Sequence, residues 1–484
     1  MILEMTTMTI NERINQYFAD KNDAFTEALA RLIAIPSERG EATDKAPYGV
    51  EPLRALEQGL EIAAEWGLKT KNWENTVGCV DLLPENDDKL HILAHLDVVP
   101  AGEGWTRPPF EMTTDDDGNL YGRGVADDKG PALSALIAMR AVKDLGTPLK
   151  HNCRLILGTD EELGSSDIAK YYATNPYGTN SFTPDSQFPA INTEKGHYRP
   201  VITGTWTGGE GAPRVSCIKG GEKTNVIPAR AYAEVVGFNE SAMFDACQII
   251  GERCNVTFSM EKLPVKAWEP KVLAITCEGV GGHAAYPQGG ANNALTALLK
   301  LLVYLPLDKK EPTNKAVFAL ADMFPHGDWL GKGLGVAQSD DISGELTLTF
   351  SVCDMDENGF RAQFDSRVPI CATEDNCHAV CVAACAAHGF TVEGKMGAAH
   401  HVPADSEFVK ILLRDLEEIT GITGEPLAIG GGTYVHNIPG GVAFGCTFPD
   451  TETYIHGADE TIPLYQLMES AKVFTKVIID LCGA

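Results

Sequence analysis

Short apolar runs alternate with helical spacings of apolar residues along the first part of the chain. Leu90 to Leu96 and Leu155 to Leu157 are unbroken apolar runs, which are typical of buried strands. Residues 10–34 and 49–66 place apolar side chains at helical spacing, and residues 131–143 also have a helical pattern. Because strands and helices alternate, this part of the chain predicts an α/β frame.

The pattern changes after Gly196 and returns to its first form near Asp405. We predict strands over 198–206, 214–217, 229–238, 272–279, 346–354 and 359–367, and helices over 241–255, 291–305 and 373–388. Beyond them we predict a helix over 405–420, a strand over 442–444 and a helix over 463–481. The fold class is therefore α/β, with a discontinuous domain of residues 1–196 and 400–484, whose helices pack around a mixed sheet. Residues 197–399 form a large inserted α+β domain.

Composition and charge narrow the class of protein. The chain is 44% hydrophobic and 22% charged, as in ordinary globular proteins, and its net charge of −28 argues against a nucleic-acid partner. Its 13 cysteines include no CxxC pair, which fits reduced thiols better than a disulfide framework. The first residues lack the features of a signal peptide, and no window is apolar over the length of a membrane span. We therefore expect a cytoplasmic protein that binds neither nucleic acid nor membrane.

Two of the predicted strands end in side chains that can bind a metal. His95 and Asp97 end the first strand and lie two residues apart, so that their side chains share one face. A carboxylate near a metal-binding imidazole can hold the other ring nitrogen and fix its tautomer. The second strand ends in Asp160-Glu161-Glu162. Because sites in α/β proteins form at the carboxyl ends of strands, the two groups are expected to belong to one site.

Three further stretches add carboxylates and an imidazole. Asp127-Asp128 follows Gly122 and Gly124, Asp185 lies in FTPDSQFP, and His456 lies in YIHGADE. Each stretch alone also has an ordinary explanation. A His-x-Asp pair is common on surfaces, Asp-Asp can cap a helix, and an acidic run can form the first turn of a helix. Their occurrence together favours a metal site.

Taken together the motifs resemble the M20 family of co-catalytic metallopeptidases, and most closely its PepV-type dipeptidase branch. The motifs that carry the resemblance occur in the family's order: HLDVVPAGEGW, GRGVADDKGP, GTDEELGS, FTPDSQFP, GGHAAYP, GGGTYVHN and YIHGADE. The resemblance covers roughly residues 12–482. It implies a catalytic domain built from the frame, a lid domain built from the insert, and a monomer.

The resemblance also implies two divalent metal ions per chain. Asp127 would bridge them, His95 and Asp185 would hold one, and Glu162 and His456 would hold the other. Imidazole and carboxylate ligands suit Zn²⁺. Mn²⁺ or Co²⁺ would fit as well, since no thiolate is present to favour a softer metal.

Other residues are assigned by their match to family motifs. Glu161 resembles the general base, which takes a proton from water and passes it to the leaving amine, and Asp97 would orient His95. In the family the peptide bond between Asp127 and Asp128 is cis.

The insert would supply groups that bind substrate. His283 would polarise the scissile carbonyl, Asn225 would contact substrate, and Arg367 would clamp a carboxylate through two hydrogen bonds. His436 stands where an arginine is expected in dipeptidase relatives. Backbone N–H groups near the same carboxylate would come from Gly430, Gly431, Gly432 and Thr433.

These assignments predict an enzyme that hydrolyses the peptide bond of small, unblocked dipeptides through a metal-bridged water. Two alternatives remain open at this point. One is an N-acyl amino acid deacylase of the same family, although the size of the insert favours the dipeptidase. The other is a non-catalytic metal-binding relative, which would have no need of a base such as Glu161.

Overall fold

The computed structural model describes residues 8–209, 211–266 and 268–483, which form two compact units, each with its own hydrophobic core. The first unit comprises the chain up to Thr193, His401–Leu427 and the chain from Gly432 onward. The second comprises Glu194–His400 and Ala428–Gly431. The predicted α/β class with a large inserted α+β part is confirmed.

A mixed sheet forms the centre of the first unit. Its strands follow the order β1 (Lys69–Trp73), β2 (Val77–Asp81), β6 (Asn152–Gly158), β3 (Asp88–His95), β7 (Asn180–Thr183), β24 (Gly441–Ala443), β8 (Ile191–Glu194) and β22 (His400–His401), and β23 (Leu427–Ile429) pairs with β8. The β6–β3, β3–β7 and β7–β24 pairs are parallel, whereas the β1–β2, β2–β6 and β24–β8 pairs are antiparallel. The carboxyl ends of β6, β3 and β7 therefore lie at one edge of the sheet.

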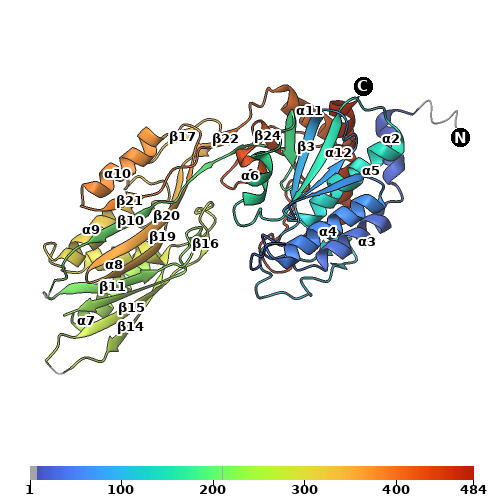
Figure 1. The fold of residues 1–484 in the computed structure, drawn as a ribbon. Coiled ribbons are helices and arrows are strands. Elements are labelled where there is room, and N and C mark those ends of the chain that lie inside the picture. Colours follow the sequence, from blue (N-terminus) through green and yellow to red (C-terminus); the bar gives the residue numbers. More distant parts are fainter. Residues whose placement is uncertain (1–7, 210, 267, 484) are drawn as a thin grey trace. The chain divides into compact units, whose positions relative to one another are not determined.

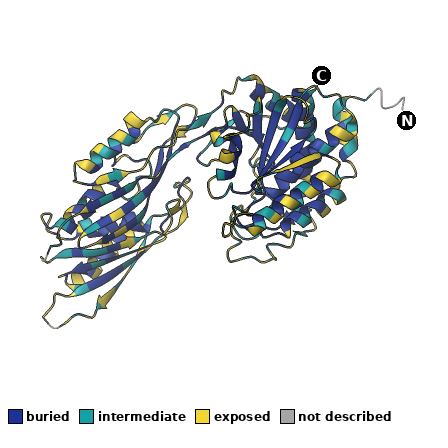
Figure 2. Cartoon of the chain, in the orientation of Figure 1, coloured by how far each residue is buried: buried dark blue, intermediate teal, exposed yellow. Residues whose placement is uncertain are grey.

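Helices surround this sheet (Figure 1). They are α2 (Ile10–Phe18), α3 (Asn22–Ile33), α4 (Val50–Glu65), α5 (Lys129–Leu145), α6 (Ser166–Tyr172), α11 (Glu407–Thr420) and α12 (Leu464–Cys482). The helices α5 and α12 pack against each other and against β3, and both are buried along most of their length (Figure 2). Their central place explains why α5 carries apolar residues on nearly every side.

The structure departs from the predicted elements in detail. The helical pattern over residues 10–34 forms two helices, α2 and α3, because the chain turns at Ala19–Lys21, where Asp20 and Lys21 interrupt the apolar stripe. The strand predicted over 198–206 is divided into β9 (Gly196–Tyr198) and β10 (Val201–Thr205). Pro200 lies at the break, and proline has no backbone N–H for the sheet.

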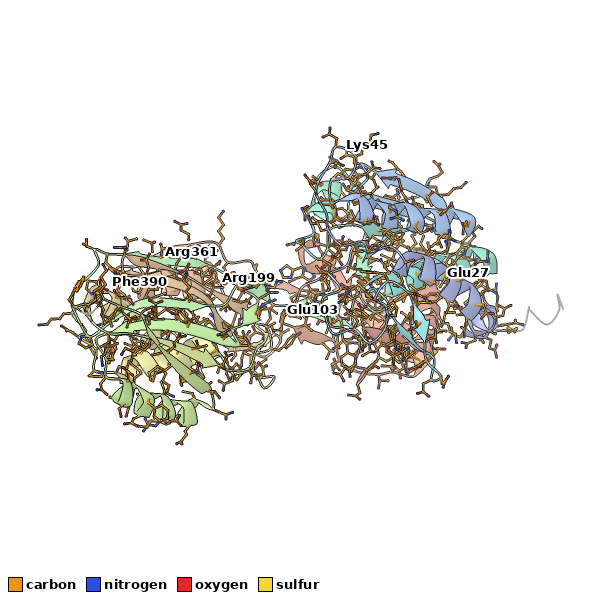
Figure 3. The ribbon with its side chains drawn as sticks, turned by 90° about the horizontal axis from the view of Figure 1, so that it is seen from below. Glu27, Lys45, Glu103, Arg199, Arg361 and Phe390 are labelled. Atoms are coloured by element: carbon orange, nitrogen blue, oxygen red, sulfur yellow. The ribbon has the colours of Figure 1, made fainter. Side chains whose placement is uncertain are left out.

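The second unit is built on a long antiparallel sheet. Its strands follow the order β14 (Thr257–Leu263), β15 (Val272–Glu278), β13 (Arg230–Val236), β11 (Arg214–Gly220), β19 (Thr347–Asp356), β20 (Gly359–Val368), β10 and β21 (Thr391–Glu393), and β9 pairs with β20. Its helices are α7 (Glu240–Cys254), α8 (Ala294–Tyr304), α9 (Pro312–Met323) and α10 (Ala379–Ala386), the last preceded by a π-helical turn over Glu374–His378. Figure 3 shows the side chains of this unit around Arg199, Arg361 and Phe390.

Small strand pairs complete the two units. In the second unit β12 (Val226–Ile227) pairs with β16 (Gly282–His283), and β17 (Ser339–Asp340) pairs with β18 (Gly344–Glu345). In the first unit β4 (Thr113–Thr114), β5 (Asn119–Tyr121) and β25 (Thr461–Pro463) form a three-stranded sheet. Within the described part of the chain, no helix combines the length and the apolar character needed to cross a membrane.

Candidate metal centre

The strand register brings the polar ends of β3 and β6 together. His95, the last residue of β3, pairs with Gly158, the last residue of β6. The loops that follow these strands carry Asp97 and the Glu161–Glu162 pair, and Asp185 follows β7 on the other side of β3. Three loops with acidic side chains therefore leave the same edge of the sheet.

One carboxylate lies between two imidazoles at this edge. Asp127 Oδ1 is 3.0 Å from His95 Nε2, and Asp127 Oδ2 is 3.0 Å from His456 Nε2. Glu162 Oε2 lies 3.3 Å from His456 Nε2, and Asp185 Oδ2 lies 3.6 Å from His95 Nε2. The structure thus brings together all five residues that the sequence analysis assigned to metal binding.

The chemistry of this group fits divalent ions. Although Asp127 is near, the buried Nε2 of His95 forms no hydrogen bond with any residue that the structure describes. Ligand atoms of His95, Asp127 and Glu162 lie within 4.8 Å of one another. An imidazole nitrogen without a hydrogen-bond partner among carboxylate oxygens is the arrangement that a borderline cation would complete.

The hydrogen bonds of His95 and Asp97 fix the surroundings. His95 Nδ1 donates to the backbone oxygen of Asp97 at 3.0 Å, which leaves the lone pair on Nε2 for the carboxylate side. The Asp97 carboxylate accepts the backbone N–H groups of Glu161 and Glu162, each at 3.2 Å. We expected Asp97 to orient His95. The ring donates its hydrogen bond to the backbone oxygen of Asp97, and the Asp97 carboxylate accepts the backbone N–H groups of Glu161 and Glu162.

Burial and neighbouring charge perturb the ionisation of the cluster. Burial raises the pKa of Glu161 well above its usual range, and the charges of Asp185 and Glu162 add to this effect, while His95 opposes it. Burial also opposes ionisation of Asp127, but the neighbouring imidazoles of His456 and His95 outweigh burial and hold the pKa of Asp127 below its usual range. Several buried carboxylates crowd together here, and a bound cation would reduce the repulsion between their charges.

Asp128 is also engaged in the centre. Its Oδ2 accepts the backbone N–H of His95 at 2.9 Å, and the peptide bond between Asp127 and Asp128 is cis, as the family resemblance implied. The Asp128 side chain is buried, so that it braces β3 from within the first unit.

Tyr434 and Asp167 support the centre, and the sequence analysis gave neither a role. The Tyr434 ring meets the His95 ring edge-on with centroids 6.1 Å apart, and its hydroxyl donates to Asp167 Oδ2 at 2.7 Å. The same oxygen accepts the backbone N–H of Thr159 at 2.6 Å. Tyr434 belongs to the GGGTYVHN motif, which the sequence analysis singled out, but nothing in the sequence indicated its contacts with His95 and Asp167.

The residues expected to bind substrate lie in the second unit, apart from Gly432 and Thr433, which belong to the first. In the β12–β16 pair, Val226 lies opposite His283, and the backbone oxygen of Asn225 accepts the N–H of Ala284 at 2.9 Å. Asn225 and His283 therefore neighbour one another.

Arg367 is held by a carboxylate of its own strand. Its Nε donates to Asp365 Oδ1 at 2.7 Å and its Nη2 to Asp365 Oδ2 at 3.3 Å. Its Nη1 donates to the backbone oxygen of Gly430 at 2.6 Å. These three hydrogen bonds fix the orientation of the guanidinium beside the glycine loop. Gly430 and Gly431 of this loop belong to the second unit, and Gly432 belongs to the first.

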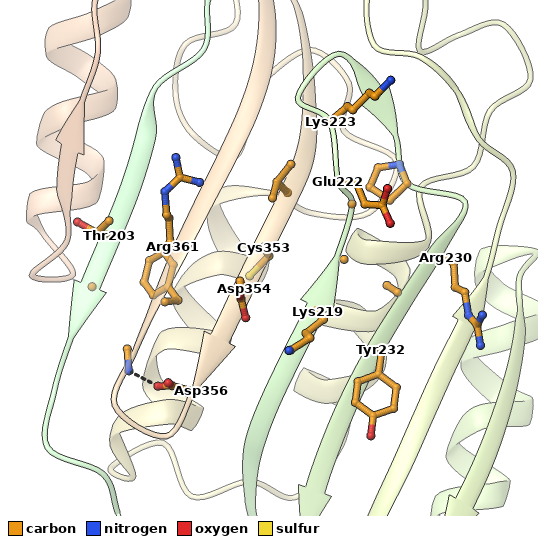
Figure 4. Close-up of a pocket in the computed structure, with 18 of the residues that line it drawn as sticks. Thr203, Lys219, Glu222, Lys223, Arg230, Tyr232, Cys353, Asp354, Asp356 and Arg361 are labelled. Atoms are coloured by element: carbon orange, nitrogen blue, oxygen red, sulfur yellow. Dashed lines mark hydrogen bonds between the residues drawn. The ribbon is translucent and has the colours of Figure 1, made fainter. Parts of the chain in front are cut away.

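A large hollow of the described structure lies apart from these residues. It occupies 1120 Å³ on the open face of the second unit's sheet, between Lys219, Tyr232, Asp354 and Arg361 (Figure 4). None of the candidate site residues lines it. Charged side chains of both signs line it together with apolar ones such as Val352 and Phe360.

Comparisons with known proteins show the family of this chain. Residues 91–480 match the model of peptidase family M20/M25/M40. The Beta-Ala-Xaa dipeptidase of Lactobacillus delbrueckii subsp. lactis is 32% identical over 468 residues, which cover 95% of this chain and 96% of that protein.

Two solved structures share the fold. Human carnosine dipeptidase 1 aligns with a TM-score of 0.57 at 15% identity over 98% of this chain and 99% of that one. The aminoacylhistidine dipeptidase of Vibrio alginolyticus aligns with a TM-score of 0.55 at 14% identity over 95% of this chain and 97% of that one. The chain therefore belongs to peptidase family M20/M25/M40, a family of metal-dependent peptide hydrolases.

Proposed function

We propose that this protein is a dipeptidase that hydrolyses unblocked dipeptides with the help of two divalent metal ions. The observation that carries the proposal is the placing of one carboxylate, Asp127, with a different oxygen toward each of two imidazoles, those of His95 and His456. Carboxylates that share two ions in this way are suited to the short spacing of two-metal hydrolytic sites. The relative that cleaves Beta-Ala-Xaa dipeptides supports the substrate class.

The ligands divide into two sets around Asp127. His95 and Asp185 would hold one ion, and His456 and Glu162 the other. Nitrogen and oxygen ligands without thiolate favour Zn²⁺, Mn²⁺ or Co²⁺. When bound, the ions would supply Lewis-acid polarisation of the scissile carbonyl and a lowered pKa for water.

Glu161 would act as the proton carrier. Its backbone N–H is held by the Asp97 carboxylate at 3.2 Å, and it directly precedes a proposed ligand. Its carboxylate would accept a proton from water and deliver it to the nitrogen of the leaving amine. A non-catalytic metal protein would not require a second, non-ligating carboxylate at this position.

Substrate recognition would use both ends of a dipeptide. Arg367 would bind the carboxylate, because one Nη1 hydrogen and one Nη2 hydrogen remain after its bonds to Asp365 and Gly430. The backbone N–H groups of Gly431, Gly432 and Thr433 would assist. Asn225 and His283, which neighbour one another in the second unit, would contact substrate and polarise the carbonyl. The carboxylates of the metal centre would attract the free amine.

The test is a panel of substrates with the metal-loaded enzyme. It should contain free dipeptides, including β-alanyl dipeptides, together with N-acetylated dipeptides, tripeptides and N-acyl amino acids. We expect kcat/KM for free dipeptides to exceed the others by at least roughly tenfold, which corresponds to ~1.4 kcal/mol of transition-state binding. Faster cleavage of N-acyl amino acids than of any free dipeptide would replace this proposal with the deacylase.

A further inference from the structure

A buried carboxylate behind the metal centre gathers hydrogen bonds from the loop that carries Asp127. Glu460 has 0% of its surface exposed. Its Oε1 accepts the backbone N–H groups of Ala126 at 2.9 Å and Asp127 at 3.0 Å. Its Oε2 accepts the N–H of Gly124 at 3.0 Å and Arg123 Nη1 at 2.6 Å. Four donors therefore converge on one side chain, and one of them is the backbone of the bridging residue itself.

Arg123 extends this contact to the loop of His456. Its guanidinium, which is 1% exposed, also donates from Nη2 to the backbone oxygen of Gly457 at 2.9 Å. Gly457 directly follows His456. The Arg123–Glu460 pair thus connects the two loops that present Asp127 and His456, although more than three hundred residues separate them along the chain.

The backbone of His456 depends more on such contacts for its position than the backbone of His95 does. His95 ends a strand that is paired on both sides, so the sheet fixes its backbone. His456 lies in a loop, its side chain is 54% exposed, and its φ of 61° is in the left-handed region, as are those of Tyr454 and Asp459. A side chain on a loop is positioned less accurately than one on a strand unless other contacts hold the loop.

We propose that Glu460 is a positioning residue for the metal ion on the His456 side. It fixes the loop of Asp127 relative to the loop of His456, and thereby the spacing between the shared carboxylate and the second imidazole. This inference rests on the proposed two-metal function. It predicts that loss of the Glu460 contacts weakens the ion held by His456 and Glu162 and spares the ion held by His95 and Asp185.

Glu460→Gln is a sharp test because the change keeps the size of the side chain. An amide has one acceptor oxygen and one donor group, so in either orientation its NH₂ faces two of the four donors. The matched control is Glu452→Gln, the same change at an exposed residue of the same loop, whose carboxylate accepts only a hydroxyl, that of Tyr454, in the described structure.

The measurement is a calorimetric titration of Zn²⁺ into the metal-free full-length protein, which needs no activity. The wild type and Glu452→Gln should bind two ions. Glu460→Gln should keep one affinity within about threefold and lose roughly 10- to 100-fold in the other, the range found when a group that supports a metal ligand is removed. His456→Ala identifies the site: adding Glu460→Gln to it should leave the remaining affinity unchanged.

The outcomes separate the two proposals. Fewer than two ions in the wild type would overturn the two-metal function itself. Two ions in the wild type, with both affinities unchanged or both equally weakened in Glu460→Gln, would overturn the positioning role alone. If circular dichroism shows that Glu460→Gln is unfolded, Arg123→Lys takes its place. Lysine keeps the charge but cannot reach both Glu460 and Gly457, and the same outcomes decide.

Discussion

Glu161 and Glu162 are neighbours in sequence but have different surroundings. Glu162 Oε2 lies 3.3 Å from His456 Nε2, and burial raises the pKa of both carboxyl groups above the usual range. We propose that Glu162 is a metal ligand and that Glu161 carries the proton. The two roles can be separated by single substitutions.

Glu161→Gln should keep the fold and both metal ions and lose most of the turnover. A general acid–base residue contributes ~10²–10⁴-fold to the rate, because the proton must otherwise pass to bulk water. We would measure kcat beside metal content by atomic absorption. Glu27→Gln, an exposed change on α3, is the control. A kcat within about threefold of wild type would assign the base to another residue.

The strand β20 carries two arginines that make a matched pair. Arg367 is buried beside Asp365 and Gly430, and Arg361 is exposed on the open face, where it donates to Gln363. Both lie on one strand and both would lose the same atoms on change to alanine. Their comparison isolates the proposed carboxylate clamp.

Arg367→Ala should raise KM and lower kcat/KM by at least roughly tenfold, since a bidentate charged hydrogen bond to the substrate is lost. Arg361→Ala should leave both constants within about twofold. Metal content should be unchanged in both variants. Because Asp365 also binds Arg199, it keeps a cationic partner when Arg367 is removed. Equal kinetic effects of the two variants would exclude Arg367 as the clamp.

The contact between α11 and α12 contains an ionisable group that destabilises the fold at neutral pH. Burial raises the pKa of Asp415 to about 6, although Arg414 and Lys476 oppose the shift. Its Oδ2 has no hydrogen-bond partner among the described residues. An acid whose pKa is higher in the folded state favours folding when protonated, so this contribution is full below pH ~4 and is lost as pH rises through 6.

Asp415→Asn removes this titration. The unfolding temperature of the variant minus that of wild type should therefore become more positive between pH 5 and pH 7.5. Over this interval the change corresponds to about 1.4 kcal/mol for a folded-state pKa near 6. Differential scanning fluorimetry at the two pH values measures it. A difference that does not change with pH would show that Asp415 titrates normally.

At the scale of the whole molecule, the two units have separate cores, and the candidate metal ligands all belong to the first. A metal ion that binds only the folded state stabilises that state by about 4 kcal/mol when the free metal concentration is a thousand times the Kd. Calorimetry should therefore show two unfolding transitions, of which chelation lowers one. A single transition, or an equal shift of both, would mean that the units unfold together.

Much of the architecture could be predicted because unbroken apolar runs identify the buried strands and helical spacing of apolar residues identifies the helices. The runs ending near His95 and Gly158 predicted two strands, and the α/β class with its insert is confirmed. Spacing could not place His456 beside Asp127; only the family motifs did so. The contacts of Glu460 could not be predicted at all, since they depend on backbone N–H groups, which have no signature in the sequence.

The residues that flank the second unit's long segment are hydrogen-bonded to one another within the first unit. Thr193 Oγ1 lies 2.8 Å from His401 Nδ1, and Asn192 and Val402 exchange hydrogen bonds through the Asn192 side chain and backbone. The entropy lost in closing a loop grows only with the logarithm of its length, so about two hundred residues cost little more than a few dozen. The first unit should therefore tolerate a shorter or longer inserted segment between Thr193 and His401. Replacing that segment by a short Gly-Ser linker should leave the first unit able to fold.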